Sequence, residues 1–514
     1  MDAPRERHGE SLYAVVEPEG ETSIAFYDHE GLVPPNLVRY DLHSLTVGIR
    51  DRADTRFVPY RRYFGRIPDA SAPPSALLER LGAAMDFSDS EDSVGDIPAG
   101  YTYLGQFVFH DLSSMKAGTS AATPRNVRSA ALDLDSIFGA LPTESGPRQS
   151  QAWPAPVTVG ETTDGQLRDI PRTSEGIPVL ADRRNDSNLP LAQMHMALMR
   201  FYNAVCQVSD GDAEGRRLTQ LHFQSVVLHD YARRIIDPAV YEDVMEHGRA
   251  IIHTDDRAFL LPLEFAAACA RFGHSMVRNT YPWNAMHPGA NLHAFWDNTF
   301  ISAVNPITRL RGHWAADWPR LVGVGLAAGE QPIFAAKINT RLAFPLKNIR
   351  PQALSDPPGS PLPFRNLAIR SLVRGHILKL SGAQDVFARM ARQLRHLRRP
   401  EFDLLTEEEL TEGETQQVRD VLTERPDGRG VRLIHCTPLW FYVLKEASAK
   451  SRGLKLGPLG SRIVMETLHA AISEAEPSIL RSPDGQQWRP DERLRSASPA
   501  NYTFADLIAF SGLA

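Results

Sequence analysis

The sequence contains little cysteine. Three cysteines occur in 514 residues, at Cys206, Cys269 and Cys436, and each lies in apolar surroundings far from the other two. An odd, widely spaced set does not fit the dense disulfide framework of small secreted domains. We therefore expect reduced, buried thiols.

Long apolar runs and an excess of charge are missing as well. No run approaches the roughly 20 apolar residues needed to span a bilayer, and the first seven residues lack the apolar core of a signal peptide. A net charge of -6 and a pI near 6.3 give no electrostatic reason to expect nucleic acid or an anionic membrane as a partner. We expect a cytoplasmic protein with no membrane span.

Helical periodicity is what the sequence has in abundance. Apolar residues recur at spacings of three and four from Leu191 to Val205, and a seven-residue spacing continues from Leu221 to Ile235. Segment 86–96 predicts a loop, and 113–173 predicts a long irregular excursion. Nothing predicts an extended alternating sheet, so the class is mainly α. Further helices are predicted near 262–280, 383–396, 437–451, 458–474 and 503–511.

The most informative motif is Gly105-Gln106-Phe107-Val108-Phe109-His110-Asp111. In a helix, Gln106 and His110 share one face, whereas His110 and Asp111 point about 100° apart and must face different partners. Polar groups inside an apolar stretch indicate a buried reaction centre, and two directions imply two cofactors. The alternative for His110 alone is a core histidine with satisfied hydrogen bonds.

A second histidine occurs in the run Arg271-Phe272-Gly273-His274. It lies in an apolar helical segment, and Arg271 lies one turn back on the same side. An axial haem ligand with a propionate partner needs this arrangement, although a cysteinate ligand remains the alternative. Together, the Gln-x-x-x-His-Asp and Arg-x-Gly-His elements resemble the animal-type haem peroxidases of the peroxidase-cyclooxygenase superfamily, in a bacterial-type form without a secretory leader.

The resemblance runs from about Tyr60 to the C-terminus. It implies one large helical haem peroxidase domain over 60–514, with long irregular loops and little sheet, and an N-terminal extension over 1–59 packed on the core. It also implies that the protein reduces hydrogen peroxide and oxidises a small organic donor through an oxoferryl intermediate. One alternative is a haem-dependent oxygenase, dioxygenase or peroxygenase that tailors a specific lipid or secondary metabolite. A second alternative is a non-catalytic haem-binding protein.

Peroxide cleavage needs a base, an acid and a cation, and the resemblance assigns all three. His110 would move the proton, and Gln106 would hydrogen-bond the peroxide. Counted back from His195, Arg184 takes the place of the distal arginine, with Arg183 as the runner-up if the loop register slips. The alternative for these arginines is a solvated surface loop, and His195 itself is expected to be structural.

On the other side of the haem, the resemblance makes His274 the iron ligand, with Arg271 and Arg374 near the haem. A haem histidine usually donates its second ring nitrogen to an acceptor that fixes its orientation. Ser371 stands at the position of the family's asparagine acceptor. A serine hydroxyl could still accept this bond, although its side chain is shorter.

The positions through which animal enzymes bind their haem covalently differ in this chain. Phe109 and Ser187 replace the two carboxylates, and Asn188 replaces the methionine of one enzyme type. We therefore expect noncovalent haem b. Arg271 stands where the related fatty-acid oxygenases carry a radical-forming tyrosine, which favours a peroxidase or peroxygenase cycle.

Asp111 matches the calcium site of the family. The remaining ligands are expected from the following loop: the side chains of Ser129, Asp133 and Asp135 and the carbonyl of Ala131. Alternate residues of an extended segment share a face, and oxygen ligands of this kind favour calcium. The alternative is an acidic turn with no metal.

Overall fold

The computed structural model describes most of the chain. Within the predicted extension of 1–59 the structure describes only five two-residue strands, the last of which is β5 (Val58–Pro59), so the packing of the extension on the core stays a prediction. Among those strands, β1 (Ser11–Leu12) pairs with β4 (Phe26–Tyr27), and β2 (Val15–Val16) pairs with β3 (Thr22–Ser23). The described residues are 11–12, 15–16, 22–23, 26–27, 58–68, 72–87, 93–116, 124–126, 128–139, 157–252, 259–300, 307–349, 365–425, 430–481 and 487–514.

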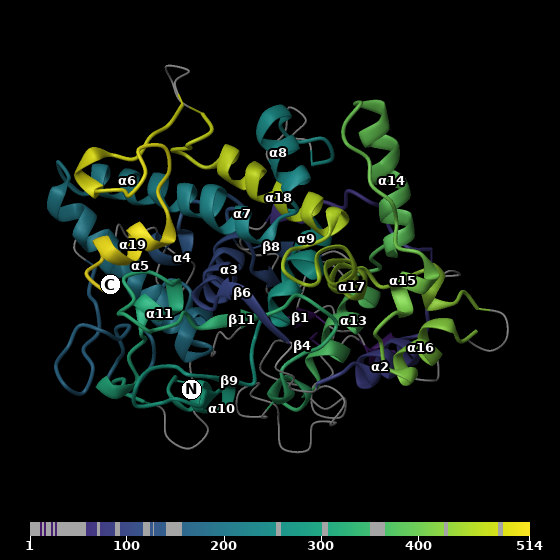
Figure 1. Cartoon of the computed structure of the whole chain (residues 1–514), viewed down its shortest axis with the longest axis horizontal. Helices are drawn as coiled ribbons and strands as arrows, with labels where there is room; N and C mark the ends of the chain where they lie inside the picture. Colours follow the sequence, from purple (N-terminus) through teal and green to yellow (C-terminus); the bar gives the residue numbers. More distant parts are fainter. Residues whose placement is uncertain are drawn as a thin grey trace.

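Helix α3 (Gly100–Leu112) lies in the middle of the molecule (Figure 1). Most of its residues are buried, on every side of the helix. A helix that is buried all round belongs to the core of a large domain, because no face of it has to meet water. Its neighbours, with their bounds, are η3 (Arg183–Asp186), α5 (Leu189–Val208), η4 (Val226–Tyr231), η5 (Cys269–His274) and α11 (Trp318–Val322).

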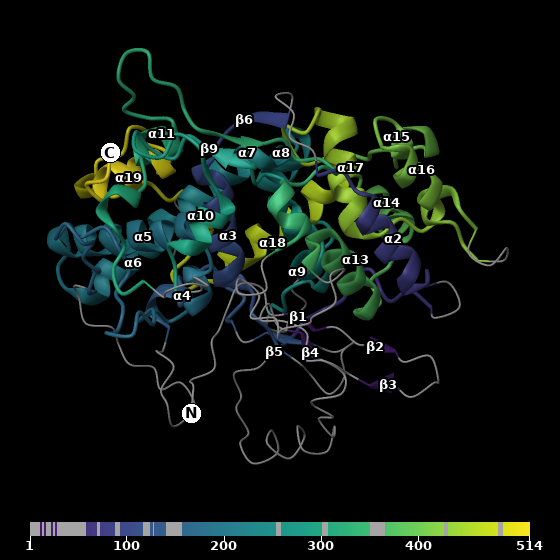
Figure 2. The ribbon, with the colours of Figure 1, turned by 90° about the horizontal axis from the view of Figure 1, so that it is seen from below.

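One group of helices lies on the left of α3 in both ribbon views (Figures 1 and 2). Its longest member, α5, begins after Asn188, whose side chain accepts a hydrogen bond from Leu191 N, and its apolar stripe is the one predicted from the spacing. The segment with the seven-residue spacing, from Leu221 to Ile235, is also helical, but its middle part forms the π-helix η4. The other members are α6 (Asp212–Ser225) and α19 (Phe504–Phe510). Two short helices, α7 (Ala232–Ile235) and η11 (Glu492–Leu494), follow η4 and precede α19 in the sequence.

A second group lies on the right in the same views (Figures 1 and 2). In this group α2 (Ser75–Ala84) and α13 (Leu367–Ile377) approach each other closely, because Gly82 has no side chain: a Cβ there would lie 2.6 Å from Ile369 N. The predicted helices at 383–396, 437–451 and 458–474 are confirmed. The others in this half are α8 (Pro238–His247), α9 (Leu263–Ala267), α14 (Ala383–His396), α15 (Glu407–Thr411), α16 (Gln416–Thr423), η10 (Leu433–His435), α17 (Leu439–Ser451) and α18 (Pro458–Glu474).

The strands are short and form only small sheets within the described ranges, which confirms a mainly α class. Strand β8 (Arg125–Asn126) pairs with β5 and with β7 (Met115–Lys116), and β9 (Thr280–Tyr281) pairs with β10 (Ala290–Asn291). The remaining short helices are α4 (Asp135–Phe138), α10 (Leu292–Asp297), η6 (Gly312–Trp314) and η7 (Phe344–Lys347).

Two predicted segments differ from the structure. The predicted loop at 86–96 ends in strand β6 (Val94–Pro98), which pairs with β11 (Phe334–Ala336), a partner too distant in sequence for local patterns to reveal. The predicted helix at 262–280 is short: it breaks at Ala268, continues as the 3-10 helix η5 and gives way to β9. No helix in the described ranges has the length and apolar character to cross a bilayer.

Candidate functional site

A cavity lies between α3 and η5, bordered by Gln106 on one wall and His274 on the other. The space inside it that holds no protein atoms is about 1090 Å³, part of it open to solvent. Its described lining is Thr102, Tyr103, Gly105, Gln106, Phe109, Ser187, Asn188, Tyr231, Ala270, Arg271, Gly273, His274, Met276, Val277, Leu292, Trp296, Leu346, Ile349 and Leu367.

His274 and Arg271 border the cavity together, as their spacing predicts. The pKa of His274 lies well below its usual value, chiefly because the ring is desolvated and secondly because Arg271 and Arg374 lie nearby. The ring is therefore neutral and able to bind a metal. The Arg271 guanidinium lies 5.2 Å from the Phe109 ring centroid, and its Nε donates to the carbonyl of Ala266 at 3.1 Å.

The hydrogen bond expected between His274 and Ser371 is not formed. Nδ1 of His274 and Oγ of Ser371 are both buried without a hydrogen-bond partner in the described ranges. Ser371 instead borders a separate cavity, whose space without protein atoms is about 470 Å³, together with His376 and Cys436. Arg374 is buried and is also outside the lining of the larger cavity.

His110 lies one helical turn beyond Gln106 but is fully buried and does not border the cavity. Its Nδ1 lies 2.8 Å from Oδ1 of Asn185, and Nδ2 of Asn185 lies 2.9 Å from Nδ1 of His195. Because an amide oxygen only accepts, Nδ1 of His110 carries the proton and Nε2 is the basic nitrogen. Burial first, and then the charge of Arg184, lower the pKa of His110 to about 3, so the ring is neutral near pH 7.

Arg184 is buried, and its guanidinium is directed into the protein rather than into the cavity. It forms a two-pronged ion pair with Asp182, with Nε 2.9 Å from Oδ1 and Nη2 2.6 Å from Oδ2. It also donates to the carbonyls of His110 and Ser113, at 3.0 and 2.9 Å. Arg184 thus holds the C-terminal turn of α3, and neither it nor Arg183 belongs to the described cavity lining.

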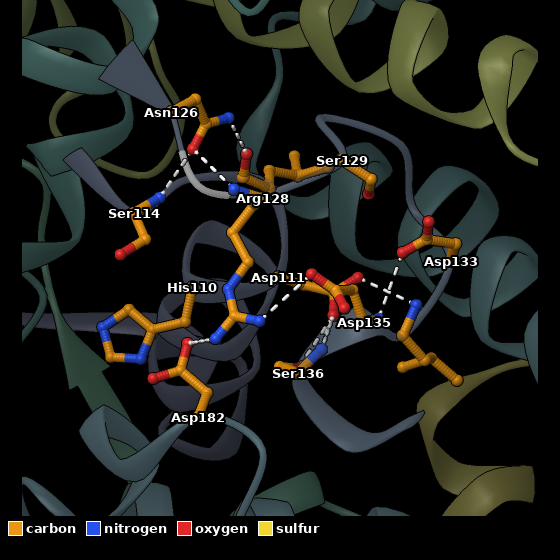
Figure 3. A network of polar contacts seen from close by, with 12 residues as sticks. His110, Asp111, Ser114, Asn126, Arg128, Ser129, Asp133, Asp135, Ser136 and Asp182 are labelled. Atoms are coloured by element: carbon orange, nitrogen blue, oxygen red, sulfur yellow. Dashed lines mark hydrogen bonds and ion pairs between the residues drawn. The ribbon is translucent and has the colours of Figure 1, made fainter. Parts of the chain in front are cut away.

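Asp111 faces away from His110, as predicted, and binds the loop before α4 (Figure 3). Its Oδ2 accepts from Leu134 N at 3.0 Å, and its Oδ1 accepts from the amide and hydroxyl of Ser136 at 2.9 and 2.7 Å. On the other side of the loop, the buried Arg128 guanidinium bridges Asp182 at 2.5 Å and Asp135 at 3.1 Å (Figure 3). One buried cation therefore joins this loop to the segment that holds His110.

The loop does not have the extended form predicted for calcium ligands. Ala130 and Leu134 adopt left-handed conformations, with φ of 63° and 59°, which break the alternation of faces and send Asp135 to Arg128. No group of three or more His, Cys, Asp or Glu side chains in the described residues is placed to hold a metal ion. Burial and the neighbouring carboxylates raise the pKa of Asp111 and of Asp133.

The predictions about the cysteines and about covalent attachment of haem can also be compared with the cavity wall. The three cysteines are free, but only Cys269 is buried as expected, whereas Cys206 and Cys436 are partly exposed; none of them borders this cavity. Phe109, Ser187 and Asn188 do border it, and none of them carries a carboxylate or a thioether. Sequence reasoning missed the roles of Asn185 and Arg128, although both stand beside residues that the motifs selected.

The cavity fits a haem by the chemistry of its donors. A neutral imidazole with an unpartnered Nδ1 lies on one wall, an amide side chain lies on the opposite wall, and a single arginine lies beside the histidine. Most of the remaining lining is apolar, as a porphyrin face requires. His274 and Arg271 are the residues that would hold it.

The comparisons with known proteins show that this chain resembles several solved structures in fold. No family model and no curated protein matches the sequence. Among solved structures, peroxidase A of Dictyostelium discoideum has a TM-score of 0.56 at 13% identity, over 88% of this chain and 93% of that chain. The fatty acid alpha-dioxygenase of Oryza sativa has a TM-score of 0.52 at 13% identity over 88% and 79%, and that of Arabidopsis thaliana has 0.51 at 12% over 98% and 82%. The chain therefore shares the fold of these peroxidase and fatty acid alpha-dioxygenase structures.

Proposed function

We propose that this protein is a haem-dependent peroxidase, which reduces hydrogen peroxide and oxidises a small organic donor. The observation that carries the proposal is the cavity with Gln106 on the α3 wall and His274 on the η5 wall. His274 would bind the iron of noncovalent haem b, and Arg271 would pair with a propionate. When bound, haem supplies the redox chemistry that splits the peroxide and oxidises the donor.

The α3 side would bind and deprotonate the peroxide. Gln106 borders the cavity and would hydrogen-bond the peroxide there. The bond to Asn185 defines Nε2 as the basic nitrogen of His110. To accept the proton from the near oxygen and return it to the far one, Nε2 would have to become accessible from the cavity, which His110 does not border in this structure. Arg184 would support this step by holding the carbonyl of His110, and a direct role for Arg184 on the peroxide would require its release from Asp182.

The test is the absorption spectrum of the haem-loaded protein before and after a stoichiometric addition of hydrogen peroxide. We expect a histidine-ligated ferric spectrum that changes rapidly with peroxide and returns when a phenol is added. His274→Ala should abolish this ligation, whereas His376→Ala, at a half-buried histidine outside the cavity lining, should leave it intact. Failure of the parent to take up haem, or a haem spectrum inert to peroxide, would contradict the proposal.

A haem-dependent oxygenase is the second candidate, since the cavity walls are largely apolar and two of the neighbours are fatty acid alpha-dioxygenases. The two candidates differ in the fate of oxygen. A peroxidase releases the peroxide oxygens as water, whereas an oxygenase leaves isotopically labelled oxygen in the organic product. Haem binding without either outcome would identify a non-catalytic haem protein.

We also propose that the loop before α4 binds calcium. Asp111 is a buried carboxylate whose charge is disfavoured by burial and by the partly buried Asp133, and Ser129 and the Ala131 carbonyl supply further oxygens. Asp135 would join only by leaving Arg128. Metal analysis of the purified protein should find one calcium per chain, lost in Asp133→Asn and retained in Asp164→Asn, a change in a distant loop.

A further inference from the structure

Two hydroxyl groups at one end of the cavity have no hydrogen-bond partner in the described part of the chain. Oγ1 of Thr102 is buried and unpaired, and the hydroxyl of Tyr231 forms no hydrogen bond with a described residue. Both residues border the cavity and both are 6% exposed. A buried hydroxyl without a partner is unfavourable because it has lost its hydrogen bonds to water, so a polar ligand atom at this position would be favoured.

The local backbone brings the Tyr231 hydroxyl to this position. Tyr231 is the last residue of the π-helix η4, and the wider turn of a π-helix changes the direction of the side chains that follow it. Its ring packs against Gly105 of α3, where a Cβ would lie 2.2 Å from the tyrosine oxygen. Only glycine at this place leaves room for the phenol, so α3 and η4 together shape this end of the cavity.

Charge is concentrated at the other end. Arg271, the one arginine or lysine in the described lining, stacks on Phe109, which is seven residues and about 10 Å along the α3 axis from Thr102. The surroundings are apolar, and they include Met276, Leu292, Trp296, Leu346 and Ile349. A carboxylate beside the two hydroxyls would lose its hydration without gaining a cation, whereas a neutral oxygen would lose little.

We propose that Thr102 and Tyr231 form a subsite for an uncharged oxygen group, a hydroxyl or a carbonyl, of an organic compound with an apolar body. Each side chain donates a hydrogen bond to that oxygen, and the apolar walls hold the rest of the compound. This inference deepens the proposed function. It rests on that function in one respect, namely that the compound is the substrate of the proposed enzyme. Binding of the compound to this subsite can be measured without any enzymatic turnover.

The test is isothermal titration calorimetry of the haem-loaded protein with two probes of equal chain length, 1-octanol and octanoate. The alcohol should bind more tightly than the carboxylate. Thr102→Val and Tyr231→Phe keep the shape of each side chain and remove one hydrogen bond, so each should weaken 1-octanol binding roughly two- to tenfold. Tyr103→Phe is the matched control: Tyr103 also borders the cavity, but its hydroxyl already donates to the Tyr281 oxygen at 3.2 Å.

Three results would overturn the inference: tighter binding of octanoate, no binding of 1-octanol by the parent, or equal 1-octanol affinity in the parent and both variants. Thermal unfolding of each variant shows whether a loss of affinity reflects a loss of fold. The haem spectrum of the same samples separates the two proposals. Haem uptake without 1-octanol binding contradicts the subsite alone, whereas 1-octanol binding by a protein that takes up no haem contradicts the haem function alone.

Discussion

The two walls of the cavity are built differently. Behind the α3 wall, His110 and His195 are hydrogen-bonded through Asn185, and the segment is fixed by the ion pairs of Arg184 and Arg128 with Asp182. On the η5 side, Nδ1 of His274 has no partner, and the serine expected to bind it has none either. The ring nitrogens that face Asn185 are satisfied without a ligand, whereas Nδ1 of His274 is not.

The difference between the two walls determines on which side a ligand would gain binding energy. Buried polar groups that satisfy one another stabilise a single geometry, which suits residues that must be aimed at a reacting atom. An unpaired ring nitrogen on the opposite side leaves the histidine free to adjust when its other nitrogen binds a metal. We expect mutations on the α3 side to affect folding and mutations on the η5 side to affect cofactor binding.

The largest expected effect comes from the cation that joins the α3 side to its loop. Arg128→Met should lower the free energy of unfolding by about 3–5 kcal/mol, because it leaves the buried Asp182 without one of its two partners. Urea unfolding measures this change. The control is Arg80→Met, which breaks the exposed pair with Glu424 and should have a far smaller effect. Similar losses in both variants would contradict a special role for Arg128.

Next in size is a pH effect on the same side. Burial lowers the pKa of His195 from 6.5 to about 4, so the unfolded chain binds more protons between these values. The stability from neutral His195 is fully present above pH 6.5 and is lost as the pH falls through 4, by roughly 3 kcal/mol in total. In His195→Gln, which keeps an acceptor and does not titrate, urea unfolding should show a shallower loss over this range. If His195→Gln loses unfolding free energy with falling pH as steeply as the parent does, His195 is not the source of this pH dependence.

A smaller effect is expected at the amide between the two histidines. Asn185→Ala leaves one ring nitrogen of His110 and one of His195 without a partner, and should cost about 2 kcal/mol of unfolding free energy. It should also slow the reaction with peroxide, because the proton is no longer fixed on Nδ1. Unchanged stability together with unchanged peroxide kinetics would show that Asn185 does not position His110.

The smallest effect is expected on the η5 side. The Ser371 hydroxyl forms no hydrogen bond in the described ranges, so Ser371→Ala should change the unfolding free energy by less than about 0.5 kcal/mol. Thermal and urea unfolding measure this directly. A loss comparable to that of Asn185→Ala would show that both sides depend equally on internal hydrogen bonds, and would remove the contrast between them.

Much of the fold and part of the site could be predicted from the sequence. The helical stripes, the opposite directions of His110 and Asp111, and the common wall of Arg271 and His274 all follow from spacing along one helix. The pairing of β6 with β11, the left-handed turn at Leu134 and the ion pair of Arg184 could not be predicted in this way. They depend on partners from other segments or on backbone conformations that no periodic pattern encodes.

The sequence by itself determined the class and the two motifs, because helical period and residue type are local properties. The tertiary structure alone decided which polar groups are satisfied. It directed Arg184 to Asp182 and left His274 Nδ1 unpaired. It also brought the Tyr231 hydroxyl against Gly105, from segments more than a hundred residues apart. The physical reason is that a buried polar atom must find its partner among the groups that packing brings to it, wherever those groups lie in the chain.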